Sequence, residues 1–216
     1  MSSTSTDAIT QKTTTSAVGS ILGAGVLSGA LFASGYLLSG YIPGGGQTDA
    51  KSVTDFYNGT STGTAYLLFF GLLAAAVCLI WFFTLLGTRL GESNQTYVGV
   101  RLATIGTALL IAGGAIMLAP LSAMKISGAD FVGVPTAIAF AQAGLGVMVI
   151  GGVWMLATAA IMLSWHARRV DAYPAWLSWA GLTLGVLSLG SVLWAPGILL
   201  AVWFVLVGVG LRAKDL

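Results

Sequence analysis

Apolar segments separated by short polar ones are the dominant pattern along this sequence. A helix that crosses a hydrocarbon core about 30 Å thick needs about 20 mostly apolar residues. Such segments become helices in a bilayer because each backbone N–H and C=O group must find a partner within the segment. The pattern predicts an all-α fold, a polytopic transmembrane helical bundle that forms one domain over residues 17–216. Its six spans are expected at about 18–42, 65–86, 98–118, 135–165, 175–193 and 195–211.

The two ends of the chain leave alternatives open. Residues 1–16 are rich in Ser and Thr and are predicted to form a disordered tail, because they offer too little apolar surface to bury. The apolar run that follows is longer than the core of a usual signal peptide, which favours a retained span over cleavage. About 14–17 apolar residues follow Pro196, so the sixth predicted span is long enough to cross the membrane only if Trp194 and Ala195 are counted as part of it. A re-entrant hairpin is the alternative for the fifth and sixth spans.

The polar segments predict how the bundle is oriented. A polar loop is expected between the first two spans, and Pro120 is expected to end the third, because proline removes a backbone donor. With both termini inside, the inner segments hold Lys12, Arg89, Arg101, Arg168, Arg169, Arg212 and Lys214, and the outer ones Lys51 and Lys125. Basic residues favour the cytoplasmic side, so both termini are expected in the cytoplasm of a multi-pass protein of the cell membrane.

Tryptophans near predicted span ends are expected to anchor the bundle at the membrane interfaces: Trp165, Trp176, Trp179 and Trp194.

Composition narrows the classes of function. Only 7% of the residues are charged, against about 25% in soluble domains, so lipid must be the solvent over most of the surface. A net charge of +2 with dispersed basic residues gives no reason to expect a nucleic-acid partner. One histidine and one cysteine exclude a bis-His haem, a His-cluster zinc site and an intrachain disulfide within the chain. We therefore expect no cofactor, and no catalytic residues are assigned.

The fourth predicted span carries the candidate chemistry. Met148, Met155 and Met162 fall within roughly 40° of one another on a regular α-helix, and His166 lies one turn beyond Met162. Thioethers and an imidazole suit Cu(I), which makes copper handling one hypothesis. The same face carries small residues such as Ala141 and Gly144, so helix packing is the favoured interpretation. A cavity for a small lipophilic molecule is the third.

Two polar residues flank this stripe. Gln142 lies about 100° or more from it and is expected either to form a hydrogen bond to another helix or to line a polar pocket. His166 begins a basic cluster with Arg168 and Arg169. Contact with lipid headgroups is the favoured role for this cluster, and binding of a partner protein or an anionic ligand is the alternative.

Glycine pairs on the first span raise the question of self-association. Gly25 and Gly29 are spaced four apart, which allows a second helix to approach closely. A homodimer interface is one interpretation, and packing within the chain is the other.

The segment Arg168–Gly190 resembles a feature of small bacterial six-pass membrane proteins. In it, Pro174-Ala-Trp176-Leu177 precedes a Gly-rich span, and Gly210-Leu211-Arg212 closes the last span in a similar way. That family has no assigned activity, so the resemblance implies the six-span count and transfers no functional residue. The expected function is a non-enzymatic integral membrane protein that packs with itself or with a membrane-protein partner, or contacts the lipid bilayer. A transporter or binder of a small lipophilic molecule is the alternative, with copper handling third.

Overall fold

The structure is a computed structural model that describes residues 4–43, 49–193 and 195–214, with side chains at 21–43, 49–191 and 196–211. Every regular element in these ranges is a helix, which confirms the all-α prediction for this part of the chain. The α-helices are α1 (Thr4–Ser39), α2 (Ala50–Gly59), α3 (Thr62–Leu90), α4 (Asn94–Lys125), α5 (Val134–Gly146), α6 (Trp154–Arg169), α7 (Ala175–Ser188) and α8 (Leu199–Lys214). A π-helix, η1 (Val147–Val153), joins α5 to α6, and the 3-10 helices η2 (Leu189–Leu193) and η3 (Ala195–Ile198) join α7 to α8.

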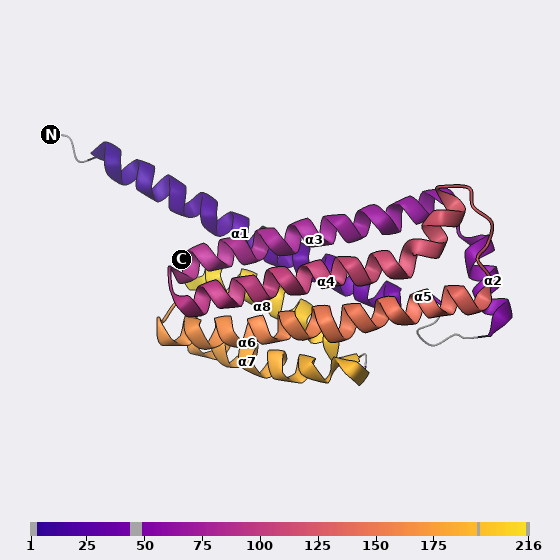
Figure 1. Ribbon diagram of the computed structural model, residues 1–216. Helices are drawn as coiled ribbons and strands as arrows, with labels where there is room; N and C mark the ends of the chain where they lie inside the picture. The colour runs from indigo at the N-terminus through magenta and orange to yellow at the C-terminus, as the bar shows by residue number, and fades with distance from the viewer. Residues whose placement is uncertain (1–3, 44–48, 194, 215–216) are drawn as a thin grey trace.

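The long helices form a closed ring (Figure 1). α1 packs against α3, α3 against α4, and α4 against the continuous rod made of α5, η1 and α6. α6 then packs against α7, α7 against α8, and α8 against α1. The first and last helices of the chain therefore lie side by side and close the bundle.

The described residues contain four helices that are long and apolar enough to cross a membrane. These are α1 from Ile21, α3, α4 and the α5–η1–α6 rod. α7 and α8 are shorter, at 14 and 16 residues. They form a hairpin whose tip ends short of the far end of the bundle in Figure 1. The predicted fifth and sixth spans are thus present as helices, but as shorter ones than the other four.

The first helix begins earlier than the apolar pattern indicates. α1 starts at Thr4, so its bounds include most of the segment 1–16 that we expected to be disordered. Once a helix has formed, each added residue gains one hydrogen bond without a new nucleation cost, which favours such an extension. Residues 1–3 lie outside the described part of the chain, as does Trp194.

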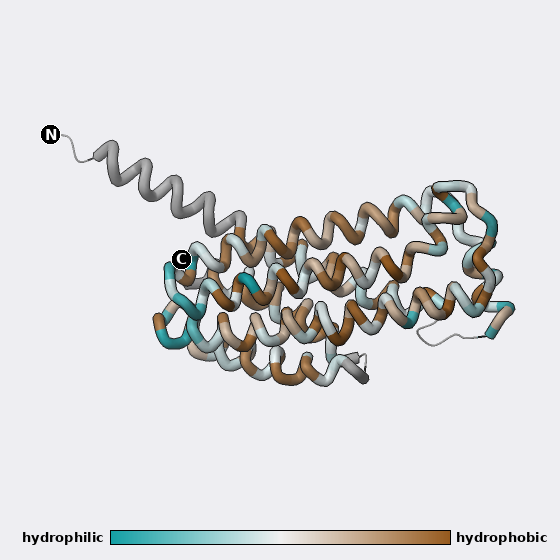
Figure 2. The backbone as a smooth tube through the Cα atoms, viewed as in Figure 1, coloured by the Kyte–Doolittle hydropathy of each residue, from teal (hydrophilic) through white to brown (hydrophobic). Residues whose placement is uncertain are grey.

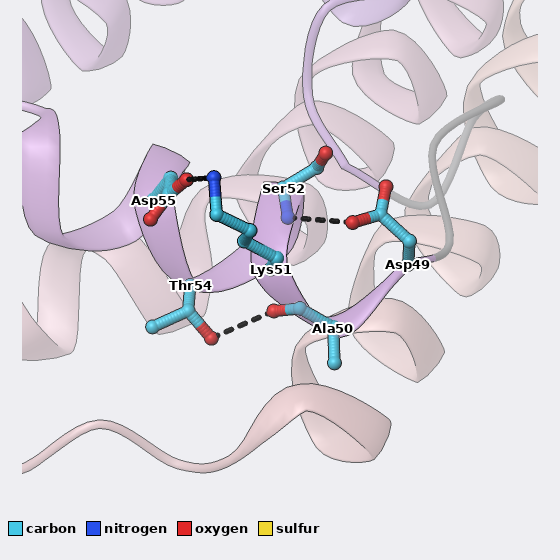
Figure 3. Close-up of polar contacts among 6 residues, drawn as sticks. All are labelled: Asp49, Ala50, Lys51, Ser52, Thr54 and Asp55. Atoms are coloured by element: carbon cyan, nitrogen blue, oxygen red, sulfur yellow. Dashed lines mark hydrogen bonds and ion pairs between the residues drawn. The ribbon is translucent and has the colours of Figure 1, made fainter.

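The prediction of a polar loop between the first two spans was wrong, because this segment contains α2. Asp49 caps its first turn: the Ser52 N–H donates to the carboxylate at 2.8 Å, and this bond lowers the pKa of Asp49 (Figure 3). Lys51 pairs with Asp55 at 3.2 Å on the exposed side. On the inner side Tyr57 is buried, with its ring centroid 5.4 Å from that of Phe131. A buried face formed by Val53 and Tyr57, together with one capping carboxylate, favours this short helix.

The expectation that Pro120 ends the third span was also wrong. α4 continues through Pro120 to Lys125, and Pro120 itself is buried. Proline is tolerated inside membrane helices because neighbouring helices and local adjustments satisfy the freed backbone groups.

Polar residues gather at the two ends of the bundle, and apolar residues follow the helices between them (Figure 2). We call the end with the α3–α4 turn, the α6–α7 turn and the last turn of α8 the basic end. Its arginines with described side chains are Arg89, Arg101, Arg168 and Arg169. The opposite end, which we call the α2 end, holds Lys51 and Lys125. The helix order therefore brings together the basic residues that the sequence placed on one side.

Glycines allow three pairs of helices to approach closely. A Cβ added at Gly25 of α1 would lie 2.7 Å from the Phe204 carbonyl oxygen of α8. One added at Gly113 of α4 would lie 2.7 Å from the Met148 nitrogen, and one at Gly185 of α7 would lie 3.1 Å from the Ala157 oxygen of α6. Real Cβ atoms essentially never come within 3.0 Å of another heavy atom, so only glycine fits at Gly25 and Gly113, and the contact at Gly185 is tighter than nine in ten real ones.

Candidate functional site

The predicted methionine stripe is interrupted by η1. Bonds from residue i to i+5 place more residues in each turn than an α-helix has, so the face that follows is rotated. Gly144, which precedes η1, and Met148, which lies in its first turn, face α4; after η1, Leu163, and not Met162, lies against Gly99 of α4. A regular α-helix would have kept the three methionines on one face. The glycines at positions 151 and 152 weaken the α-helix here, because glycine is a poor helix former.

The three methionines consequently have different surroundings. Met148 is 6% exposed and lines a cavity. Met155 is half-buried, with its Cβ close to the position that a Cβ on Gly106 would take. Met162 is also half-buried. Among the described side chains, no group of three His, Cys, Asp or Glu residues is placed to hold a metal ion.

The cavity at Met148 is an apolar groove of about 290 Å³. Its walls are Leu31–Ile42 of α1 and the turn after it, Leu67–Leu79 of α3, and Thr107–Leu118 of α4. All three segments belong to the half of the bundle nearer the α2 end. The α7–α8 hairpin ends short of that end, so fewer helices share the space there (Figure 1). This volume is at the lower limit for ligand pockets in proteins.

Two hydroxyl groups in the groove wall form hydrogen bonds within their own helices. The Thr107 hydroxyl donates to the Ala103 carbonyl at 2.9 Å, and the Ser39 hydroxyl donates to the Tyr36 carbonyl at 2.7 Å. Such bonds to a preceding carbonyl satisfy a buried hydroxyl without a ligand. The groove is therefore suited to an apolar molecule and offers few groups to hold a polar one.

Two glycines keep the groove open. A Cβ added at Gly35 of α1 or at Gly71 of α3 would meet nothing within 4 Å, although both residues line the groove. Side chains at these positions would point into empty space. Gly114, also in the wall, is different because a Cβ there would lie 2.7 Å from the Leu72 side chain.

The deep end of the groove is closed by aromatic rings. Phe32 stacks on Tyr36 with centroids 5.8 Å apart and meets Phe204 edge-on at 5.7 Å. Below it, Phe204 and Trp203 of α8 pack against Phe82 of α3. Tyr36 lies against the tip of the α7–α8 hairpin. Gly197 leaves room for the Tyr36 ring there, because a Cβ on Gly197 would collide with that ring. Aromatic packing of this kind forms a rigid floor.

Gln142 does not take part in the groove. Its side chain is exposed on α5 and does not line the cavity. The interpretation of Gln142 as a pocket residue therefore has no support in the geometry.

His166 is buried at the basic end and is bonded through both ring nitrogens. Nδ1 lies 3.0 Å from the Gln95 Oε1 atom, and Nε2 lies 3.1 Å from the Ser93 hydroxyl. An amide oxygen only accepts, so Nδ1 carries a proton and donates to Gln95, and Nε2 shares a hydrogen bond with the Ser93 hydroxyl. Ser93 also accepts from the Thr96 N–H at 3.0 Å as the N-cap of α4. His166 therefore ties α6 to the start of α4.

Replacing His166 by alanine is expected to lower the free energy of unfolding by about 1–3 kcal/mol, because the two hydrogen bonds that the buried imidazole forms with Gln95 and Ser93 are lost, each worth about 0.5–1.5 kcal/mol. Unfolding in mixed micelles by dodecyl sulfate titration measures this change. In a double-mutant cycle, His166→Ala and Gln95→Ala should not be additive. Arg169→Ala, on the exposed side of the same helix, serves as the control and should change stability by less than about 0.5 kcal/mol. Additive effects would contradict the pairing.

The arginines beside His166 face outward. The Arg168 guanidinium lies 4.3 Å from the Trp179 ring centroid, and that of Arg169 lies 5.2 Å from the Trp165 centroid. Both tryptophans are exposed, which fits their predicted place at a membrane interface. Tyr173, in the turn between these helices, is buried, and this burial raises the pKa of its phenol. The predicted basic cluster is thus divided into a buried histidine and two exposed arginines.

Comparisons with protein-family models, with curated proteins and with solved structures find no match.

A lipophilic cavity bordered by the methionine face was one interpretation of the sequence, but its position between α1, α3 and α4 was not predicted. The signal that could have indicated it is the pair Gly35 and Gly71, which lie within apolar spans without being part of a close helix contact. From sequence alone these glycines look the same as Gly25 or Gly113, which pack against backbone.

Proposed function

We propose that this protein is a non-enzymatic, integral membrane protein that binds a small lipophilic molecule in the groove between α1, α3 and α4. The observation that carries the proposal is the apolar cavity of about 290 Å³, bordered by Met148 and open at Gly35 and Gly71. Methionine suits such a wall because its flexible, polarizable side chain adapts to different apolar shapes.

Self-association through the small-residue faces has less support. Gly25 and Gly29 are covered by α8, with a Cβ on Gly29 placed 2.8 Å from the Ala201 carbonyl oxygen. The pair therefore packs within the chain, which supports the interpretation of Gly25 and Gly29 as an intramolecular contact. A membrane-protein partner or a second copy would need another surface.

We further propose six membrane segments with both termini in the cytoplasm, in the cell membrane of a bacterium, as the resemblance of Arg168–Gly190 implies. The basic end then faces the cytoplasm, in agreement with the positive-inside rule. The α7–α8 hairpin enters and leaves at that end, so its depth does not change the side on which either terminus lies.

Single cysteines test this orientation in a Cys78→Ala background. Glu92 in the α3–α4 turn and Ser127 in the loop after α4 are both exposed. In intact cells, a membrane-impermeant thiol reagent should label Ser127→Cys and should label Glu92→Cys only after permeabilisation. The reverse pattern would show that the basic end faces outward.

Filling the groove tests the binding function. Gly35→Leu and Gly71→Leu each place a side chain in the space that a ligand needs, without a clash at Cβ. Purified protein, delipidated and then exposed to micelles containing dioleoylphosphatidylcholine, should retain one lipid in native mass spectrometry. We expect both variants to lower its occupancy by about tenfold, a loss of about 1.4 kcal/mol.

Gly23→Leu is the matched control, because a Cβ there also meets nothing within 4 Å but the residue lies outside the groove on the same helix. It should retain lipid as the unmodified protein does. Equal retention by all three variants would mean that the lipid binds elsewhere, and the proposed function would then fail.

A further inference from the structure

We propose that the occupant of the groove is one straight acyl chain of a membrane lipid, lying along α3 and α4 with its methyl end at Phe32. This inference rests on the proposed binding function and specifies the class of ligand and its direction.

The length of the groove fits one leaflet of a bilayer. Its wall runs from Leu67 to Leu79 on α3 and from Thr107 to Leu118 on α4. At 1.5 Å per residue these stretches are about 18 Å and about 16 Å long. Half of a hydrocarbon core about 30 Å thick is about 15 Å. A chain from one leaflet therefore spans the groove from end to end.

The width of the groove fits a single chain. A volume of 290 Å³ spread over about 17 Å gives a mean cross-section of about 17 Å². Carbon atoms in contact lie about 3.5–4.0 Å apart, so one methylene chain fits within this cross-section.

The ends of the groove differ, which sets the direction of the chain. Leu67 and Leu38 line the groove and are also 72% and 46% exposed, so the wall is continuous with the surface that faces lipid near the α2 end. At the other end Phe32 is 5% exposed and Leu79 is 2% exposed. An acyl chain thus enters from the lipid, keeps its headgroup towards the α2 end, and ends against the aromatic floor.

Photolabelling with lipids that carry a diazirine at a known position tests this arrangement. The full-length protein is reconstituted in phosphatidylcholine vesicles containing a diazirine either at the methyl end of the chain or next to its ester. After irradiation, modified residues are located by mass spectrometry. We expect the methyl-end probe to label Phe32 or Leu79, and the ester-end probe to label Leu38 or Leu67. Gly71→Leu should reduce both labels severalfold, whereas Gly23→Leu should not.

The outcomes separate this inference from the proposed function. Groove labelling that Gly71→Leu suppresses, but that does not depend on the diazirine position, would overturn the aligned chain and leave a lipophile-binding groove. Labels confined to outward residues such as Val77 and Ile150, with no effect of Gly71→Leu, would overturn both.

Discussion

Replacing Gly25 by isoleucine is expected to prevent the protein from folding into a stable bundle. The new Cβ would lie 2.7 Å from the Phe204 carbonyl oxygen and 3.0 Å from the Gly208 Cα atom. Both are backbone atoms, so no change of side-chain rotamer relieves the contact, and α1 and α8 must separate. Overpacking of this severity should cost more than about 3 kcal/mol. Since α1 and α8 close the ring, their separation opens the whole bundle.

The measurement is the yield of monodisperse protein in detergent, followed by thermal unfolding of whatever folded material remains. Gly23→Ile provides the control on the same helix, because its Cβ meets no atom within 4 Å. It adds the same β-branched side chain and should unfold at the temperature of the unmodified protein. Normal yield and stability of Gly25→Ile would show that α1 does not pack on α8 through this glycine.

Replacing Trp203 by alanine is expected to cause the largest loss of stability among the aromatic residues. Trp203 has no exposed surface, and its ring lies 6.0 Å from Phe82 and 6.1 Å from Phe83 between centroids. Its indole N–H donates to the Ser164 hydroxyl at 3.2 Å. We expect a loss of about 3 kcal/mol, the lower end of the range for cores, because lipid is as apolar as the protein interior.

Trp176 is the matched control for this prediction. It lies near the start of α7 and is 56% exposed, so alanine there leaves no cavity in the core. Titration of both variants with dodecyl sulfate in mixed micelles compares the two losses of free energy. Equal losses would contradict the assignment of Trp203 to the bundle core.

The apolar pattern predicted the helices well because one physical requirement dominates it. The segments near 65–86, 98–118 and 135–165 lie inside α3, α4 and the α5–η1–α6 rod. Their true ends lie further out, since hydrogen bonding continues past the apolar stretch. α2 was missed because a ten-residue helix with one capping Asp49 does not differ enough in composition from a loop.

The candidate site was less predictable. A methionine spacing of seven implies one face only if the helix is α throughout, and η1 breaks that condition between Met148 and Met155. The groove depends on where three separate helices stop touching one another. Nothing in the local sequence of Gly35 or Gly71 distinguishes an open glycine from one packed against backbone.

The central claim is that the space between α1, α3 and α4 holds an apolar molecule. The most direct test is an experimental structure of the protein in a lipid nanodisc. The account predicts one elongated density beside Met148, reaching from Leu67 to Phe32 and separate from the surrounding lipid. A groove closed by the protein's own side chains, with Met148 packed directly on α3, would contradict it.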